Sequence, residues 1–371
     1  MQHKILHVIG SLDNGGSQVM VINLMRKLDH NKYIFDFVID RRDELFFKDE
    51  VDKIGGSIYV CPQFTLKNVI NFIRWWVKFL RKHPEYEIIH GHVRSTASIY
   101  LLIGKIMGRK TIAHSHSISS GNGISAVVKN ILQFPIRYIA DYFLACTAEA
   151  GCWLFGEQIK EKSNFTIIKN AIDTRGFYYD RAIRSNTRKE LRIDSDMCVV
   201  GNVARLYAPK NYVYLLKIFK KLNAMERRFC FLIVGDGPEK NELKQIVNEY
   251  ELDKSVVFLG ARKDINEILN AMDFFMMPSL YEGFGMSLIE AQSTGLMCLA
   301  SNKVPMSTRL TSNVFYEDID DNSIDKWCDF VVNNINYYRE DKSSDVKNKG
   351  FDIEQNTEAL EKIYTLLING N

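Results

Sequence analysis

Short apolar runs alternate with amphipathic segments along the whole chain. Runs rich in Val, Ile and Phe are typical of buried strands, whereas apolar residues at helical spacing indicate helices between them. Strands are therefore predicted at residues 5–9, 35–39, 57–60, 88–91, 111–113, 142–146, 166–168, 199–203, 229–234, 256–259, 274–277 and 297–300. This alternation predicts an α/β protein whose parallel sheets are covered by helices on both faces.

A polar, arginine-rich stretch at residues 180–189 interrupts the alternation. A chain of 371 residues is also longer than one ordinary hydrophobic core supports. We therefore expect two domains, at residues 1–180 and 181–353, with open parallel sheets that bind ligands at the carboxyl ends of their strands. Residues 354–371 are amphipathic and predict a terminal helix that can pack back on the first domain.

The composition, 46% hydrophobic and 25% charged with a net charge of +3, is that of a folded globular protein. The small net charge and the lack of a recognition motif disfavour nucleic-acid binding. Residues 1–181 hold 24 Lys+Arg against 17 Asp+Glu, so the basic excess lies in the first half. Seven scattered cysteines without metal-ligand spacing favour a reducing compartment. We expect a cytoplasmic protein with at most peripheral membrane contact.

The most informative motif is PSLYEGFGMSLIEAQSTG, residues 278–295. It follows a predicted strand, contains a glycine loop, and enters a helix near Met286 or Ser287. A helix N-terminus directs free N–H groups and a positive dipole end at an anion such as a pyrophosphate. Glu282 in the loop and Glu290 in the helix are placed to accept hydrogen bonds from sugar hydroxyls.

Three other turns of the second half carry candidate residues. GNVARLYAPKN delivers Arg205 and Lys210, two cations that can neutralise a departing diphosphate. VGDGPEKNELK contains Gly235 and Gly237, which allow a tight backbone beside a nucleotide or simply form a turn. The backbone around Arg262 in FLGARKDI is a candidate for the base.

In the first half, the turn in HVIGSLDNGGSQ carries Gly15 and Gly16 but no GxGxxG, which disfavours a dinucleotide site. Histidines end two predicted strands. His114 and His116 lie in TIAHSHS, and His90 and His92 lie in IIHGHVRST. Metal binding, a structural role and an active-site role all remain open for His114 and His116, and the active-site role is favoured for His116. A structural role and a place in the acceptor pocket remain open for His90 and His92.

Together these motifs resemble the retaining glycosyltransferases of family 4, whose signature is the E-x7-E element at Glu282 and Glu290. Bacterial exopolysaccharide and capsule enzymes look closest. The resemblance implies a GT-B fold, in which two Rossmann-like doubly wound domains face each other across a cleft. It implies that Arg205, Lys210, Glu282 and His116 are catalytic. His90, His92 and His114, at the ends of predicted strands, are candidates for the acceptor pocket. It also implies a set of donor-binding residues: Gly15, Gly16, Gly235, Gly237, Arg262, Gly283, Phe284, Gly285, Met286, Ser287 and Glu290.

The resemblance further implies transfer of a hexose or N-acetylhexosamine from a nucleotide diphosphate sugar, expected to be a UDP-sugar, to a saccharide acceptor, without metal or other cofactor. The Asp-x-Asp triplets at 194/196 and 318/320 lie away from the glycine turns, so we expect no metal there. Residues 67–82 form a basic amphipathic segment with Trp75 and Trp76. This segment predicts either a packing helix or contact with an anionic membrane, which would fit a lipid-linked acceptor.

Three other functions remain to be weighed. A GT-B nucleotide-sugar epimerase would show no acceptor dependence, and a catalytically silent nucleotide-sugar-binding protein would bind donor without turnover. The intact set of Arg205, Lys210, Glu282 and Glu290 disfavours the silent protein. A nicotinamide-dependent oxidoreductase is excluded by the missing dinucleotide fingerprint at the first turn.

Overall fold

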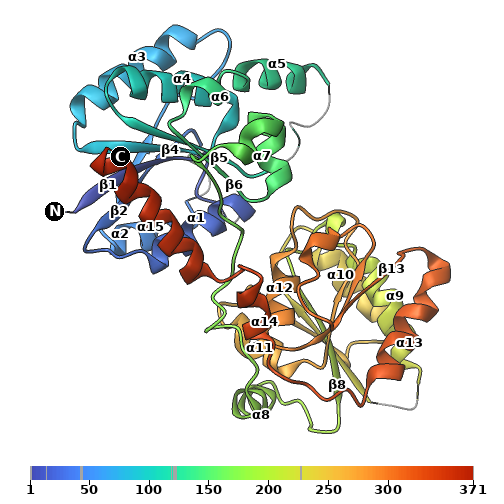
Figure 1. The fold of residues 1–371 in the computed structure, drawn as a ribbon. Coiled ribbons are helices and arrows are strands. Elements are labelled where there is room, and N and C mark those ends of the chain that lie inside the picture. The colour runs from blue at the N-terminus through green and yellow to red at the C-terminus, as the bar shows by residue number, and fades with distance from the viewer. Residues whose placement is uncertain are drawn as a thin grey trace. The chain divides into compact units, whose positions relative to one another are not determined.

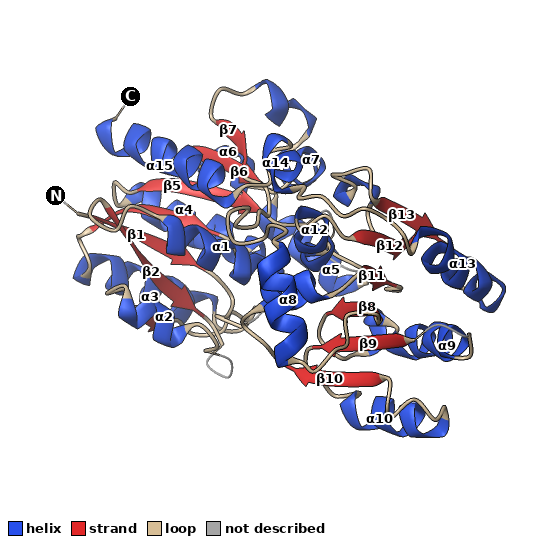
Figure 2. Cartoon of the chain, turned by 90° about the horizontal axis from the view of Figure 1, so that it is seen from below, coloured by secondary structure: helices blue, strands red, loops and turns tan. Residues whose placement is uncertain are grey.

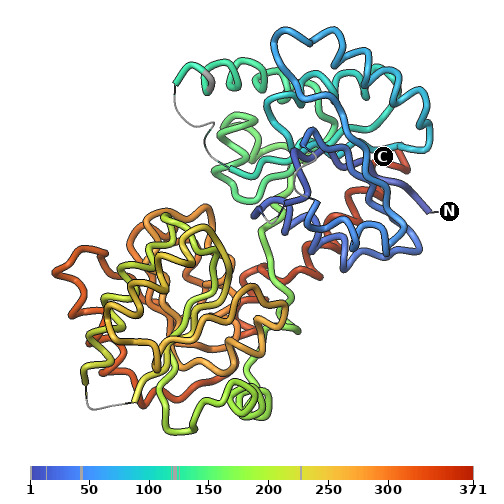
Figure 3. Tube along the Cα trace, turned by 180° about the vertical axis from the view of Figure 1, so that it is seen from behind, coloured from blue at the N-terminus to red at the C-terminus, as the bar shows by residue number. Residues whose placement is uncertain are grey.

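The computed structural model describes residues 2–13, 15–41, 45–117, 119, 123–225 and 228–370. The chain forms two compact units, which are described separately. Unit 1 comprises Met1–Ala171 and Ile353–Asn371, and unit 2 comprises Ile172–Asp352 (Figure 1). The chain therefore passes between the units twice, and Figure 3 shows both termini in unit 1.

Unit 1 is built on a parallel sheet of seven strands in the order β3-β2-β1-β4-β5-β6-β7. Its strands are β1 (His3–Val8), β2 (Tyr33–Ile39), β3 (Ile58–Val60), β4 (Tyr86–Gly91), β5 (Lys110–Ser115), β6 (Tyr142–Ala145) and β7 (Phe165–Ile167). Its helices are α1 (Gly16–Lys27), α2 (Lys48–Lys53), α3 (Val69–Lys82), α4 (Arg94–Ile106), α5 (Ile124–Gln133), α6 (Ile136–Ile139), α7 (Ala148–Phe155), η1 (Glu157–Glu161) and α15 (Ile353–Asn369).

The two faces of this sheet bury different apolar sets. One face, with Ile5 and Ile112, packs against α1 and α15. The other face, with Leu6 and Ala113, packs against α3, α4, α6 and α7. Both faces are buried, which explains why the strands read as continuous apolar runs.

Unit 2 has a parallel sheet of six strands in the order β10-β9-β8-β11-β12-β13 (Figure 2). Its strands are β8 (Cys198–Val203), β9 (Phe229–Val234), β10 (Val256–Gly260), β11 (Phe274–Met277), β12 (Met297–Ser301) and β13 (Val314–Glu317). Its α-helices are α8 (Arg181–Glu190), α9 (Tyr212–Asn223), α10 (Lys240–Glu249), α11 (Ile265–Ala271), α12 (Met286–Ser293), α13 (Ile324–Asn334) and α14 (Ser343–Asn348). Its 3-10 helices are η2 (Ala208–Lys210), η3 (Met306–Thr308) and η4 (Asp321–Ser323).

All twelve predicted strands are confirmed, and β13 is an additional strand that the pattern did not predict. β13 has four residues at the sheet edge, and Phe315 is 40% exposed. A short edge strand with one covered side lacks the apolar run that marks the inner strands.

Unit 2 begins earlier than the predicted boundary at residue 181, because the segment before α8 packs inside it. Phe177 contacts the core of unit 2, and its carbonyl accepts a hydrogen bond from Ser293 Oγ. Asp180 caps α8 by accepting from the backbone N–H groups of Ala182 and Ile183. The polar stretch at 180–189 is thus largely a helix of the second unit rather than a linker.

Candidate active site

The candidate residues of unit 2 gather where the strand order reverses. The chain enters this sheet at β8, adds β9 and β10 on one side, and then adds β11, β12 and β13 on the other (Figure 2). Ligands of open α/β sheets bind outside the carboxyl ends of the strands at such a switch point. The turns after β8 and β11 carry Lys210 and Glu282, respectively.

These two turns are fastened to each other. The backbone N–H of Leu280 donates to the carbonyl of Pro209 over 2.8 Å. Buried Asn202, on β8, donates from Nδ2 to the carbonyl of Met276 on β11 over 2.5 Å. The loops that follow the two strands are therefore held in one fixed arrangement.

Lys210 and Glu282 form a direct ion pair, in which Nζ and Oε1 are 2.5 Å apart. The two side chains are 16% and 7% exposed, and the same carboxylate oxygen accepts from Ser279 Oγ over 2.8 Å. Because the pair is largely removed from water, each charge depends on the other for compensation. The sequence suggested separate contacts for these residues with diphosphate and sugar, whereas the structure brings them together.

The N-terminus of α12 lies directly after this pair. Gly285 precedes the helix with a φ of 79°, a backbone conformation that residues other than glycine rarely adopt. Gly283 is exposed, and Met286 and Ser287 are partly exposed in the first turn of the helix. Free N–H groups and a positive dipole end are thus presented beside Glu282.

Glu290, in the same helix, is partly buried, and burial raises the pKa of its carboxyl to about 8. Among the described residues, its carboxylate has no hydrogen-bond or ion-pair partner. A carboxyl group with this environment is protonated at neutral pH. Perturbed titratable groups of this kind occur preferentially at functional sites.

Gly235 and Gly237 support the turn that carries Arg205. A Cβ on Gly235 would lie 1.9 Å from the carbonyl oxygen of Ala204, and one on Gly237 would lie 2.2 Å from that of Leu206. Both glycines are therefore required for the close approach of two loops. Arg205 itself is exposed.

Two predicted donor-binding side chains have partners within unit 2. Arg262 forms a bidentate ion pair with Asp264, at 2.8 and 2.5 Å. The ring of Phe284 stacks on Phe351 with centroids 5.6 Å apart. For both residues the backbone, rather than the side chain, remains the candidate for ligand contact.

The candidate residues of unit 1 lie at its own switch point, between β1 and β4. Gly15 is the residue before α1, and its N–H donates to Asp13 Oδ1 over 3.0 Å. Gly16 begins the helix, and a Cβ there would meet no atom within 4 Å. The position beside Gly16 is open, and its part in ligand binding stays a prediction.

The four predicted histidines of unit 1 are brought together. His90, His92 and His114 are buried and His116 is partly buried, with the ring nitrogens of His92 and His116 2.8 Å apart. Burial lowers the pKa of His116 to about 3 and holds the pKa of each of the other three well below its usual range. All four are therefore neutral at neutral pH.

Sequence reasoning missed three side chains that complete these arrangements. His7, on β1, and Tyr364, on α15, contact the predicted histidines. His7 could have been noticed because it lies within the predicted strand at residues 5–9. Ser279 directly follows Pro278 and so lies within the motif PSLYEGFG. Tyr364 carries no sequence signal, because its position depends on how α15 packs.

Other sequence features are absorbed into ordinary structure. Arg228 forms ion pairs with both Asp194 and Asp196. In α3, Trp76 is fully buried and Trp75 is partly buried, so the helix packs on the sheet through its apolar face. Among the described residues, no helix is long and apolar enough to cross a membrane.

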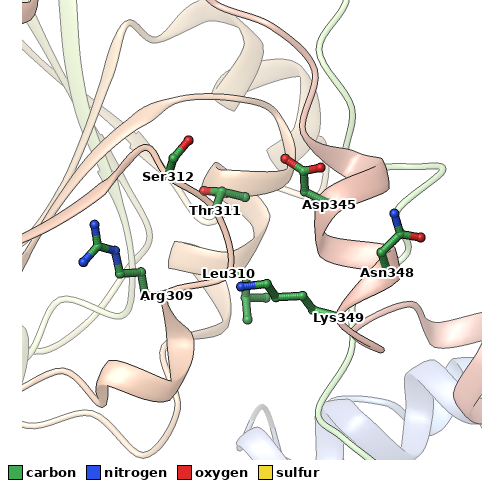
Figure 4. Close-up of a pocket in the computed structure, with 7 residues that line it drawn as sticks. All are labelled: Arg309, Leu310, Thr311, Ser312, Asp345, Asn348 and Lys349. Carbon is green, nitrogen blue, oxygen red and sulfur yellow. The ribbon is translucent and has the colours of Figure 1, made fainter.

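Figure 4 shows a surface depression in unit 2 that contains none of the predicted site residues. It is lined by Arg309, Leu310, Thr311, Ser312, Asp345, Asn348 and Lys349. The strand ends that carry Lys210 and Glu282 contribute no residue to it. The depression is therefore not the candidate active site.

Comparison with protein families identifies both halves of the sequence. Residues 14–175 match the family model "Glycosyltransferase Family 4", and residues 183–314 match "Glycosyl transferases group 1". EpsF of Bacillus subtilis (strain 168), a glycosyltransferase by name, is 29% identical over 98% of this chain and 97% of its own. An Escherichia coli enzyme, UDP-Gal:alpha-D-GlcNAc-diphosphoundecaprenol alpha-1,3-galactosyltransferase, is 29% identical over 77% of this chain and 76% of its own.

Solved structures with the same architecture cover nearly the whole chain. Anabaena Alr3699/HepE in complex with UDP has a TM-score of 0.77 and 18% identity, over 98% of this chain and all of its own. A glycosyltransferase from Rickettsia africae has a TM-score of 0.77 and 17% identity over the full length of both chains. Two parallel α/β sheets with these neighbours confirm the GT-B fold expected from the sequence.

Proposed function

Because the chain belongs to the glycosyltransferases whose two family models it matches, we propose that it transfers a hexose or N-acetylhexosamine from a nucleotide diphosphate sugar to a saccharide acceptor, with retention of anomeric configuration. The observation that carries this proposal is the fixed pair of turns after β8 and β11, with Lys210 on Glu282 beside the N-terminus of α12. Cationic and N–H groups at one point suit the charge that builds on a departing diphosphate.

The residues are given roles that follow from their chemistry. Lys210, Arg205 and the N–H groups of α12 stabilise the leaving diphosphate, and Glu282 holds Lys210 and accepts from a sugar hydroxyl. Glu290 accepts from the ribose. Retention by double displacement needs a carboxylate nucleophile near the anomeric carbon. No residue is assigned that role, so a front-face displacement with the phosphate as base is favoured.

UDP is the favoured nucleotide, and a lipid-linked saccharide is the favoured acceptor. Support comes from the UDP complex of the Anabaena neighbour and from the diphosphoundecaprenol acceptor named for the Escherichia coli relative. The O-antigen biosynthesis glycosyltransferase WclY of Escherichia coli, 24% identical over 81% of this chain, supports a role in the synthesis of exopolysaccharide, capsule or another surface glycan. The chemistry assigned to Lys210 and α12 requires no metal ion.

A screen of purified protein against UDP-, GDP- and ADP-sugars, with EDTA present, tests this function. We expect binding and slow hydrolysis of a UDP-sugar, and transfer when a lipid-linked saccharide is added. The anomeric configuration of the product, read by NMR, tests retention. Failure of every donor to bind would refute the proposed function, whereas activity that appears only with added metal would refute metal independence alone.

Membrane contact is proposed through the outer faces of α5 and α3, which both pack on α4. Exposed apolar side chains recur along α5 and the segment after it: Ile124, Val127, Ile131, Phe134 and Tyr138. Residues 88–140 include six Lys+Arg and no Asp or Glu. An apolar stripe within a basic segment fits an anionic lipid surface.

Vesicle sedimentation tests this contact. We expect the protein to sediment with phosphatidylglycerol vesicles and not with phosphatidylcholine vesicles. The change Ile131→Asn with Phe134→Asn should abolish sedimentation, while Val332→Asn, at an exposed position of unit 2, should not. Arg74→Glu with Lys78→Glu tests α3 separately. A wild-type protein that stays in the supernatant with both vesicles would refute the membrane contact.

A further inference from the structure

Five histidines occupy one face of three adjacent strands of unit 1. His7 on β1 is the register partner of His90 on β4, and His92 follows two residues later on the same face. On β5, Ile112 is the register partner of His90, so His114 and His116 continue this face at intervals of two. The face is the one that α1 and α15 cover (Figure 1). Tyr364, on α15, contacts His90 and His7 there.

The first half of the cluster is a linear series of contacts. His116 Nε2 is 2.8 Å from His92 Nδ1, and His92 Nε2 is 2.9 Å from His7 Nδ1. His7 Nε2 is 3.3 Å from the hydroxyl of Tyr364. Each inner ring therefore uses both of its nitrogens.

The second half continues from the same hydroxyl. Tyr364 Oη is 2.8 Å from His90 Nδ1, and His90 Nε2 is 3.2 Å from His114 Nδ1. The series ends at His114 Nε2 on this side and at His116 Nδ1 on the other. Both terminal nitrogens are buried and have no hydrogen-bond partner among the described residues. The six side chains, here called the histidine chain, are His116, His92, His7, Tyr364, His90 and His114.

The protonation state of these rings restricts how they can bond. Burial lowers the pKa of His7 to about 3, and it lowers the pKa of the other four rings as described above. Each ring is therefore neutral at neutral pH, with one N–H donor and one bare acceptor nitrogen. A neutral ring that donates to one neighbour must accept from the other.

The same restriction passes through Tyr364, whose hydroxyl has one hydrogen to donate. If Tyr364 donates to His90, it accepts from His7, and if it donates to His7, it accepts from His90. The whole series then has two satisfied arrangements. All five rings carry hydrogen on Nε2, or all five carry it on Nδ1.

A metal ion is the competing explanation, because the ligand atoms of His7, His90 and His92, and those of His92, His114 and His116, lie within 4.8 Å of one another. Nitrogens that share a tetrahedral zinc ion at about 2.0–2.1 Å lie roughly 3.3 Å apart. The separations of 2.8 and 2.9 Å in the chain are those of direct hydrogen bonds. The distances favour hydrogen bonds over shared metal.

We propose that the histidine chain is a single directional hydrogen-bond path, in which Tyr364 joins two halves and forces all five rings into the same tautomer. Tyr364 is then a positioning residue that couples, from α15, the state of the free Nδ1 of His116, either a bare nitrogen or an N–H, to the tautomer of His90 and His114. A ligand that bonds to either terminal nitrogen selects one arrangement for all five rings. The consequence for sugar transfer rests on the proposed function and on the catalytic role that the resemblance implies for His116. The common tautomer of the five rings does not rest on either.

NMR of protein labelled with ¹⁵N-histidine tests the common tautomer, because long-range ¹H–¹⁵N correlations separate the two neutral forms and the cation. We expect the five histidines of the histidine chain to share one neutral tautomer at pH 7. The other three histidines, His3, His30 and His83, are not part of the histidine chain and are not expected to follow it. In Tyr364→Phe, the two halves should no longer share a direction, so at least one half should change tautomer or become a mixture. Tyr33→Phe is the matched control, because the Tyr33 hydroxyl forms hydrogen bonds with Thr365 and Glu361 of α15, which are not part of the histidine chain.

Several results would overturn the proposal. These are opposite tautomers within the wild-type chain, a tautomer pattern that is unchanged in Tyr364→Phe, or stoichiometric zinc in wild-type protein after dialysis against zinc chloride. The wild-type spectrum decides the question even where Tyr364→Phe does not fold. In transfer assays, Tyr364→Phe should lower kcat about threefold to tenfold at unchanged donor KM. If the tautomer changes in Tyr364→Phe while kcat does not, the result would count against the catalytic role of His116. It would leave the common tautomer of the histidine chain standing.

Discussion

Lys210→Ala is expected to lower kcat for sugar transfer by about 10²- to 10³-fold, the usual effect of removing one donor to a developing anion. Lys210 lies in the turn after β8, at the switch point of unit 2, and its Nζ is 2.5 Å from Oε1 of Glu282. The charge on the diphosphate increases as the glycosidic bond breaks, so Lys210 should act more strongly on the transition state than on bound donor. Donor KM should therefore change much less than kcat.

The same substitution should also destabilise unit 2, which must be separated from the catalytic effect. Glu282 would lose its cationic partner while remaining largely buried, at a cost on the order of 3 kcal/mol. Replacing both members, as Lys210→Met with Glu282→Gln, removes the two charges together and should recover much of this stability. Transfer should remain as slow as in Lys210→Ala, because no cation is restored.

Lys217→Ala provides the matched control, since Lys217 pairs with Asp321 on the surface of the same unit. Exposed ion pairs contribute little, so both stability and kcat should stay near wild type. Initial rates over a range of donor concentrations and urea unfolding of the four proteins would measure these effects. A Lys210→Ala protein with kcat within twofold of wild type would remove Lys210 from the active site.

The sequence predicts the strands of this fold well and the contacts between distant turns poorly. Buried parallel strands such as β9 are apolar on both faces, which makes them visible as runs. The pairing of Lys210 with Glu282 depends on β8 and β11 being neighbours, although 72 residues separate the two side chains. Strand order is not encoded in any local pattern, so the residues were identifiable singly but their ion pair was not.

The histidine chain shows the same limit. Period-two spacing along a strand places His114 with His116, and His90 with His92, because alternate residues of a strand share a face. Joining the pairs requires the register between β4 and β5. Tyr364 is 274 residues from His90 and enters only because α15 packs on unit 1. Gly235 and Gly237 were predicted for their backbone, and their contact with the loop of Arg205 supplies a structural reason as well.

Glu290→Gln is expected to stabilise the protein at neutral pH while weakening donor binding. The pKa of the Glu290 carboxyl is raised by burial from an ordinary value of 4.5 to about 8. Between these values the folded protein holds a proton that the unfolded chain releases. The free energy of unfolding of the wild type should therefore fall as pH rises from about 4.5 to about 8. The stability contributed by Glu290 is fully present only below about pH 4.5.

Glutamine cannot ionise, so the stability of Glu290→Gln should not fall over this pH range as that of the wild type does. From pH 4.5 to 7, the stability of Glu290→Gln relative to wild type should increase by on the order of 3 kcal/mol. Glu249→Gln, at an exposed position of α10, is the matched amide substitution. Urea unfolding of the three proteins at pH 5, 6, 7 and 8 would measure the difference, and parallel pH profiles for wild type and Glu290→Gln would contradict the buried-carboxyl assignment.

Donor binding should change in the opposite direction, because the proposed ribose hydroxyls donate to the carboxylate of Glu290. At pH 9, where the Glu290 carboxyl is ionised, losing a hydrogen bond to this charged group is expected to weaken UDP-sugar binding about tenfold, as measured by calorimetry. Ribose binding also favours the ionised carboxyl, so wild-type affinity should rise between pH 7 and 9 while that of Glu290→Gln stays flat. A more stable variant with undiminished affinity would mean that Glu290 is a buried structural residue. A more stable variant with weakened affinity would mean that unit 2 retains a destabilising carboxyl group because donor binding requires it.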